Sequence, residues 1–203
     1  CQSIAIVFLQ SYKNAEHEER AEAIVRRVMQ QAGRDIPIEL SSRVAPTMRE
    51  ISRANSTIEQ AYATDPARKQ LFRIEESLKK IGYRHSLKTV LGYGGVTNIR
   101  YPRLFEAAMS GPVGGLMGAK YLGGVIGEEN IVCSDVGGTS FDAGCITAGA
   151  VPINREPGFQ DMYLTAQMLS INSIGAGTGT YIRIDPTTNR IKLGPDSAGG
   201  TPG

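Results

Sequence analysis

The chain has 203 residues, of which 41% are hydrophobic and 21% are charged, and its formal net charge is +2. This composition is typical of a globular protein with a buried core. The basic residues are scattered, which favours solvated helix faces over a nucleic-acid surface, and no apolar run approaches the roughly 20 residues that span a bilayer. We therefore expect neither nucleic acid nor a membrane as a partner.

The three cysteines are too few and too widely spaced for a disulfide scaffold or a zinc site. Cys1, Cys133 and Cys145 form no CxxC pair, which favours a reducing, cytoplasmic environment. Because Cys133 and Cys145 lie in apolar stretches, we expect both to be buried and inert. The chain begins with a cysteine and ends in the loop-like run "GGTPG", so we interpret it as a piece of a longer protein.

The first third of the chain predicts strand, helix and strand in turn. Residues 4–9, "IAIVFL", form an apolar run expected of a strand buried on both faces. A helix should follow from an N-cap at Asn14 to about Gln31, with one apolar stripe that includes Ile24 and Val28. The alternation in "IPIELS", residues 36–41, predicts the second strand.

Helical patterns dominate the middle of the chain. We expect helices at 47–65 and 67–81, separated at Pro66. A strand and a glycine turn are expected at 86–95, and a short helix at 102–109. Residues 110–122 predict a further helix with four glycines, which indicates either close helix packing or a helix N-terminus near a bound anion.

Strands joined by tight turns are expected in the last third. Residues 130–153 read as strand, glycine turn, strand, an Ala148-Gly149 turn and a third strand. Residues 180–195, "TYIRIDPTTNRIKLGP", alternate on both sides of a "DPTTN" turn and predict a hairpin. The whole pattern indicates an α/β protein with mixed sheets and helices packed across them.

The glycine turn at 135–140 carries the residues that point to chemistry. Asp135 closes an apolar strand, where a carboxylate is costly unless it is paired or holds a metal or water. Gly137 and Gly138 remove side chains, so that backbone N–H groups can converge on an anion, and Thr139 and Ser140 add hydroxyl donors. Asp135 could then bind Mg²⁺ through water or orient a nucleophile at a phosphoryl group. A plain hairpin with an Asp-initiated turn is the alternative.

A second glycine cluster, "SIGAGTGTYI" at 173–182, strengthens the interpretation of the first. Gly175, Gly177 and Gly179 could wrap the base or ribose of a nucleotide, so that two loops would face one cleft. Asp142 lies beyond the turn and could orient Thr139 or cap the turn. The chain contains no GxxxxGK[ST], and no GxGxxG follows a strand, so a Walker loop is not expected.

These motifs resemble those of a known family. "SDVGGTSFDAG" is similar to the second phosphate loop of the actin–hexokinase–Hsp70 ATPases. Five stretches more specifically resemble the hydantoinase A/5-oxoprolinase family, namely "FLQSYKNAEHEERA", "SGPVGGLMGAKYLGG", "DVGGTSFDAG", "SIGAGTGTYIRID" and "LGPDSAGGTPG". Within that family, "INREPGFQDMYL" and the sequence after Gly175 are most similar to the nucleotide-binding subunits of acetone carboxylases.

The resemblance implies a ribonuclease-H-like fold that binds ATP between two lobes. Asp135, Gly137, Gly138 and Thr139 would contact the phosphates and their Mg²⁺, and the second glycine cluster would line the nucleotide pocket. Residues 1–85 would complete the first lobe or lie between the lobes, and 86–203 would form the second, truncated lobe. The family has an earlier DxGGT loop that this chain lacks, so we expect the 203 residues alone to be inactive.

The resemblance also implies the reaction and its partners. An ATP-dependent subunit of a hetero-oligomeric enzyme would phosphorylate a carbonyl or enolate oxygen, most simply to carboxylate a ketone with bicarbonate. Cleavage of a cyclic amide, as in hydantoinases and 5-oxoprolinases, is the alternative. A nucleotide-binding assembly module without chemistry is an alternative of another class.

Overall fold

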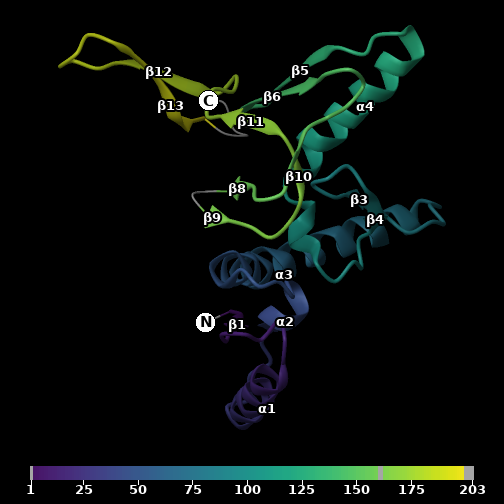
Figure 1. The fold of residues 1–203 in the computed structure, drawn as a ribbon, viewed down its shortest axis with the longest axis vertical. Coiled ribbons are helices and arrows are strands. Elements are labelled where there is room, and N and C mark those ends of the chain that lie inside the picture. The colour runs from purple at the N-terminus through teal and green to yellow at the C-terminus, as the bar shows by residue number, and fades with distance from the viewer. Residues whose placement is uncertain (1, 160–161, 199–203) are drawn as a thin grey trace. The chain divides into compact units, whose positions relative to one another are not determined.

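The computed structural model describes residues 2–159 and 162–198, so Cys1 and the end of the last matching stretch, 199–203, lie outside the described residues. The chain divides into two compact units (Figure 1). The first comprises residues 1–110 and 154–168, and the second comprises 111–153 and 169–203. This grouping places 86–110 with the N-terminal residues and differs from the predicted boundary at residue 85, so the lobes of the whole protein stay a prediction.

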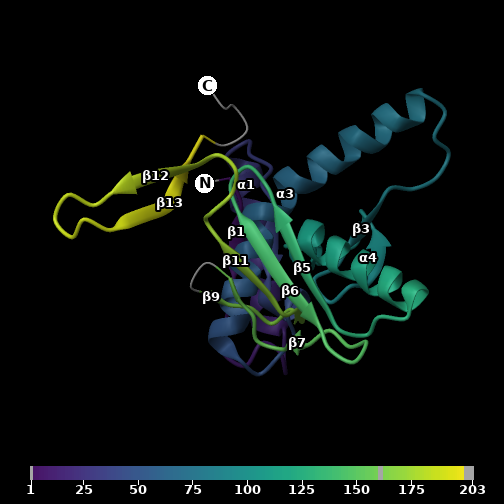
Figure 2. The same cartoon turned by 90° about the horizontal axis from the view of Figure 1, so that it is seen from above.

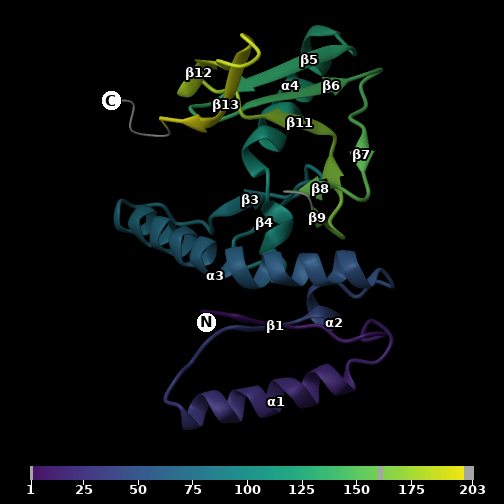
Figure 3. The ribbon, with the colours of Figure 1, turned by 90° about the vertical axis from the view of Figure 1, so that its left-hand side faces the viewer.

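The first unit combines helices with short two-stranded sheets. Its helical elements are α1 (Glu16–Gln31), α2 (Ser41–Val44), α3 (Glu50–Lys80) and the 3₁₀ helix η1 (Leu104–Ala107). Its strands are β1 (Ile4–Ile6), β2 (Ile38–Leu40), β3 (Lys88–Val90), β4 (Val96–Asn98), β8 (Gly158–Phe159) and β9 (Met162–Tyr163). The β1–β2 pair is parallel, whereas β3–β4 and β8–β9 are antiparallel. Figure 3 shows α1 and α3 on either side of β1.

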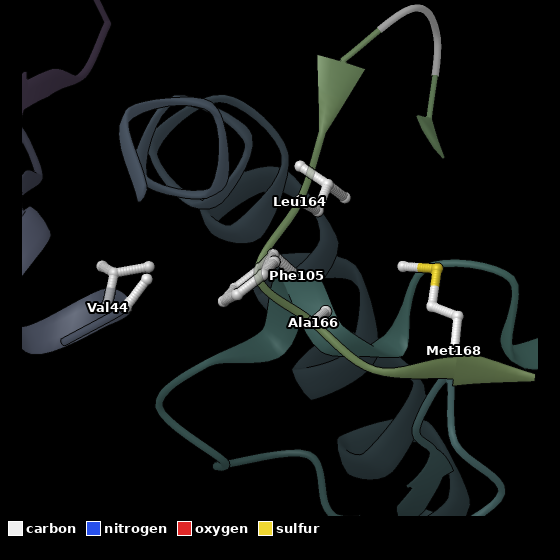
Figure 4. Packing of buried hydrophobic residues seen from close by; sticks show 6 residues of the cluster. Val44, Phe105, Leu164, Ala166 and Met168 are labelled. Atoms are coloured by element: carbon white, nitrogen blue, oxygen red, sulfur yellow. The ribbon is translucent and has the colours of Figure 1, made fainter. Parts of the chain in front are cut away.

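An apolar cluster forms the core of this unit. Its members come from α2, η1 and the returning segment after β9, namely Val44, Ala45, Phe105, Leu164, Ala166 and Met168 (Figure 4). A Cβ on Gly92 would lie 2.8 Å from Cγ of Met168, so only glycine lets the β3–β4 turn approach this core. Packing at this density makes even one added methyl group costly.

Helix α1 packs through its charged side, and its apolar stripe is only partly covered. Glu18 and Glu22 are its buried residues, whereas Ile24 and Val28 are about half exposed, at 53% and 48%. Glu18 accepts hydrogen bonds from the N–H groups of Phe8 and Ser42. A buried carboxylate satisfied in this way fixes the helix face.

Pro66 lies inside one 31-residue helix, so the predicted break between 65 and 67 is wrong. Proline removes one intrahelical hydrogen bond, but side chains on both sides of it hold the helix to one segment. Gln60 Nε2 and Arg68 Nη2 both donate to the carbonyl of Pro102, at 2.7 and 3.2 Å. Figure 3 shows α3 changing direction along its length.

The second unit contains the predicted glycine turn. Its elements are α4 (Ser110–Ile126), β5 (Ile131–Val136), β6 (Phe141–Ile146), β11 (Ile171–Ile174), β12 (Thr180–Ile184) and β13 (Ile191–Ser197). Strands β7 (Ile153–Asn154) and β10 (Met168–Leu169) pair where the chain passes between the units. The main sheet has the order β11-β6-β5 and is antiparallel, and Figure 2 shows α4 beside it.

Two further predicted turns of this unit are confirmed. Ala148 and Gly149 have φ of 48° and 69°, and Thr147 bridges Ala150 across them. The β12–β13 hairpin pairs Ile184 with Ile191, as the alternation around "DPTTN" requires. The strand that follows the Ala148-Gly149 turn, β7, pairs with β10 and not with β6. The α/β class is confirmed, while the ribonuclease-H-like assignment stays a prediction.

Candidate phosphate-binding site

Two aspartates face each other where the β5–β6 hairpin reaches its turn. Val136 pairs with Phe141, and Asp135 therefore pairs with Asp142. Residues directly opposite on antiparallel strands project to the same side of the sheet. Gly144 and Ile131 lie on this side too, where a Cβ on Gly144 would meet Leu116 of α4 and a Cβ on Gly123 of α4 would meet Ile131. The two carboxylates are therefore on the face that α4 covers.

Asp142 is buried and only partly satisfied. It is 8% exposed, and its Oδ2 accepts a hydrogen bond from Ser140 Oγ at 3.3 Å. Among the described residues, no donor reaches its Oδ1. Asp142 thus contacts Ser140 and not Thr139, the residue that the sequence suggested. Two like charges directly opposite each other repel, so this pair suits a cation.

A cavity of about 340 Å³ lies beside the two aspartates. Pro112, Gly115 and Leu116 of α4 line it together with Asp135 and Asp142. Cys133 also lines it, and burial raises the pKa of its thiol. The predicted hairpin is confirmed, and Asp135 lines this cavity, whereas residues 137–140 of the turn are not among the residues that line it.

The loop itself, residues 137–140, is closed by one hydrogen bond from Gly137 N–H to Ser140 O at 2.9 Å. A Cβ added to Gly137 would meet only Ser140 O, at 3.7 Å, which is ordinary contact. Neither crowding nor a positive φ requires glycine at this position. The space over Gly137 is therefore open to an approaching ligand.

The second glycine cluster lies directly on this loop. The N–H groups of Thr178 and Gly179 donate to the carbonyls of Gly137 and Gly138, at 2.9 and 2.8 Å. A Cβ on Gly194 of β13 would collide with the carbonyl oxygen of Gly175. The two clusters are thus brought together, and the contacts of Thr178 are ones that the sequence did not suggest.

Two expectations about burial are wrong. Asp135 is exposed at the end of β5, although its strand partner Asp142 is buried, and on the opposite side of β5 Val132 is 80% exposed. Cys145 pairs with Val132 on that side and is also exposed, whereas Cys133 is partly buried. Apolar composition predicted the strand, but the sequence could not show which of its sides other residues cover.

The pairing of Asp135 with Asp142 had a signal in the sequence. If the turn spans 137–140, strand register requires residue 135 to face residue 142. Within the described part of the chain, no group of three or more His, Cys, Asp or Glu could hold a metal. A two-carboxylate site would need ligands from water or from a bound phosphate.

The pattern of one family, hydantoinase/oxoprolinase, matches residues 53–203. The chain belongs to the hydantoinase/oxoprolinase family. No described helix is long and apolar enough to cross a membrane.

The chain is 41% identical over 198 residues to the acetone carboxylase beta subunit of Xanthobacter autotrophicus, covering 98% of this chain and 28% of that protein. A nucleotide-free structure of acetone carboxylase, from a study of ATP-dependent acetone carboxylation, superposes with a TM-score of 0.90 at 41% identity, over 98% of this chain and 28% of that one. The ATP-dependent caprolactamase of Pseudomonas jessenii superposes with a TM-score of 0.74 at 28% identity, over 100% of this chain and 29% of that one. The chain therefore spans less than a third of the length of these relatives.

Proposed function

We propose that this chain is the phosphate-binding part of a longer ATP-dependent enzyme with an actin-like, ribonuclease-H-like lobe. The observation that carries the proposal is the pair Asp135 and Asp142 at the foot of an open glycine turn. The superposed acetone carboxylase and caprolactamase are both described as ATP-dependent, which supports ATP as the ligand.

The loop fits a phosphate chain. The carbonyls of Gly137 and Gly138 are taken by the second glycine cluster, and the N–H groups of Gly138, Thr139 and Ser140 have no acceptor among residues 2–159 and 162–198. Free consecutive N–H groups form a cradle for an anion. The hydroxyls of Thr139 and Ser140 would add donors, and Gly175 and Gly179 would border the rest of the nucleotide.

The aspartate pair fits Mg²⁺. This ion takes one or two carboxylates and completes its coordination with water and substrate phosphates. Asp135 would hold it through water, and the unpartnered Oδ1 of Asp142 offers a second carboxylate oxygen. When bound, the ion would neutralise charge on the phosphates. The two carboxylates would position the ion, and the N–H groups of the loop would hold the phosphates.

The reaction most consistent with the comparisons is carboxylation of a ketone. ATP would phosphorylate a carbonyl or enolate oxygen, and bicarbonate would supply the carboxyl group. The 41% identity to an acetone carboxylase subunit supports this choice and supports a hetero-oligomer with partner subunits, for which we propose a cytoplasmic location from the sparse cysteines. The activity belongs to the longer protein and not to the 203 residues alone.

Cleavage of a cyclic amide is the second candidate. The superposition on caprolactamase over the whole chain favours it, and in both proposed reactions a carbonyl oxygen would attack the γ-phosphate of ATP. A panel of substrates separates the two, because only the true substrate should stimulate ATP hydrolysis by the complete enzyme. A module that only binds nucleotide would show no stimulation by a ketone with bicarbonate or by any lactam.

Replacing Asp135 tests the assigned role. In the intact protein, Asp135→Asn should keep the fold and lower ATP hydrolysis by about 100-fold or more, because the change removes only the charge that holds the ion. Phosphate release under saturating ATP measures this, with circular dichroism to check the fold. Asp35→Asn, at an exposed position in the first unit, is the matched control. Equal turnover in the two variants would refute the role of Asp135.

A further inference from the structure

Gly177 contacts the phosphate loop and not an open nucleotide pocket. A Cβ on this residue would lie 2.5 Å from the carbonyl oxygen of Gly137 and 2.6 Å from the backbone nitrogen of Thr139. Both neighbours are backbone atoms of the loop, so neither can rotate away. Glycine is therefore required here by the chain's own packing.

The segment around Gly177 engages three successive carbonyls of the loop. Thr178 donates to Gly137 O through both N–H and Oγ1, at 2.9 and 3.3 Å. Gly179 N–H and Ser197 Oγ donate to Gly138 O, at 2.8 and 3.2 Å. Gly177 N–H donates to Thr139 O at 3.3 Å. All three carbonyls thus point toward residues 177–179 and the end of β13.

This arrangement determines where the N–H groups of the loop point. In a planar trans peptide, the C=O of one residue and the N–H of the next point in opposite directions. With the carbonyls of 137–139 turned toward 177–179, the N–H groups of Gly138, Thr139 and Ser140 must point away from that segment. They have no acceptor in the described part of the chain.

We propose that Gly177 is a positioning residue for the phosphate loop: by allowing segment 177–179 to bind the carbonyls of residues 137–139, it presents the opposite N–H groups to the phosphates. This deepens the proposed function and rests on it. It differs from the role suggested by the sequence, in which Gly177 borders the base or ribose. The two roles differ in which part of ATP should lose affinity when Gly177 is changed.

Calorimetry with two ligands distinguishes these roles. Gly177→Ala in the intact protein should weaken binding of Mg-ATP and of magnesium tripolyphosphate by the same factor. We expect about tenfold or more, since a backbone clash of one methyl group is comparable with the 1.4 kcal/mol that corresponds to tenfold. If ATP binding weakens while tripolyphosphate binding is unchanged, Gly177 acts at the base or ribose and the inference is wrong.

Gly118→Ala is the control, because nothing lies within 4 Å of its Cβ position. The affinities for Mg-ATP and for magnesium tripolyphosphate should both be unchanged in this variant.

If Gly177→Ala does not fold, Thr178→Val tests the inference instead. It removes only the Oγ1 bond to Gly137 O, and should weaken both ligands equally by about two- to tenfold, with recovery in Thr178→Ser. If Thr178→Val leaves the tripolyphosphate affinity unchanged, the inference about Gly177 is wrong, but the proposed function is unaffected. If the unsubstituted protein binds neither ligand, the proposed function is wrong as well.

Discussion

The two units of the chain differ in the interactions that stabilise the interior of each. The first unit buries charged side chains, of which Arg53 and Glu18 are 0% exposed and Glu75 is 2% exposed. The second unit brings backbone against backbone at glycines such as Gly123 and Gly177. In the first, loss of a charged group should be damaging, and in the second, gain of a methyl group should be. Substitutions of the two kinds can therefore test the comparison.

Arg53 is the centre of the polar network in the first unit. Its guanidinium donates to the carbonyls of Thr47 and Phe8, at 2.7 and 2.8 Å, and to Ser41 Oγ at 3.1 Å. Ser41 Oγ donates in turn to Glu18 at 2.6 Å. One side chain thus ties α3 to the segment after β1 and to α2.

The largest expected effect is loss of this residue. Arg53→Met should lower the free energy of unfolding by about 3–5 kcal/mol, because it leaves the part-buried carbonyls of Thr47 and Phe8 without this donor and removes one donor to Ser41. Urea denaturation followed by circular dichroism measures the change. Arg20→Met is the control, since the side chain of Arg20 is 74% exposed and lies 3.7 Å from Glu16. A loss no larger than in the control would show that the network is dispensable.

The sequence predicted local features well and distant contacts poorly. The β12–β13 hairpin and the turn after Asp135 were predictable because alternation and turn residues lie within a few positions of each other. The unbroken helix at Pro66 was not, because it depends on Pro102, which is far along the chain. The same holds for α1, whose buried side is set by Ser41 and Ser42.

In the candidate site, too, the local features were predictable from the sequence and the distant contacts were not. Asp135 and the open position of Gly137 follow from one short motif. The contact of Gly177 with the loop joins residues 40 positions apart, and glycine spacing alone does not distinguish a residue that borders a ligand from one that supports a loop. Its required lack of a side chain is visible only in the structure.

A smaller effect in the first unit should depend on pH. Hydrogen bonds from Arg100 and from the Leu87 N–H lower the pKa of Glu75 to about 2. Because the folded pKa is below the ordinary value of 4.5, the stabilising contribution is complete above about pH 5 and is lost as the pH falls through 4.5 toward 2. The urea midpoints of the unsubstituted chain and Glu75→Gln should therefore differ at pH 7 and converge in acid.

Glu76→Gln gives the matched control on the same helix. Glu76 is exposed and adjacent to Glu75, so its substitution should change the midpoint little at any pH. If the difference between the unsubstituted chain and Glu75→Gln stayed constant from pH 7 to pH 3, the pairing with Arg100 would not contribute in the way that the geometry indicates.

The smallest expected effects come from two glycines of α4, which should respond with opposite signs. A Cβ on Gly123 would collide with Ile131 Cδ1 and lie 2.6 Å from the carbonyl oxygen of Glu128. Gly123→Ala should therefore destabilise the chain by about 1–3 kcal/mol. Gly118→Ala meets no atom within 4 Å and should stabilise it by about 0.5–1 kcal/mol, because alanine loses less backbone entropy in a helix. Urea midpoints of the two variants measure both changes. Equal stabilisation by both would mean that α4 can shift on the sheet at little cost, and close backbone packing would then not be what holds the second unit together.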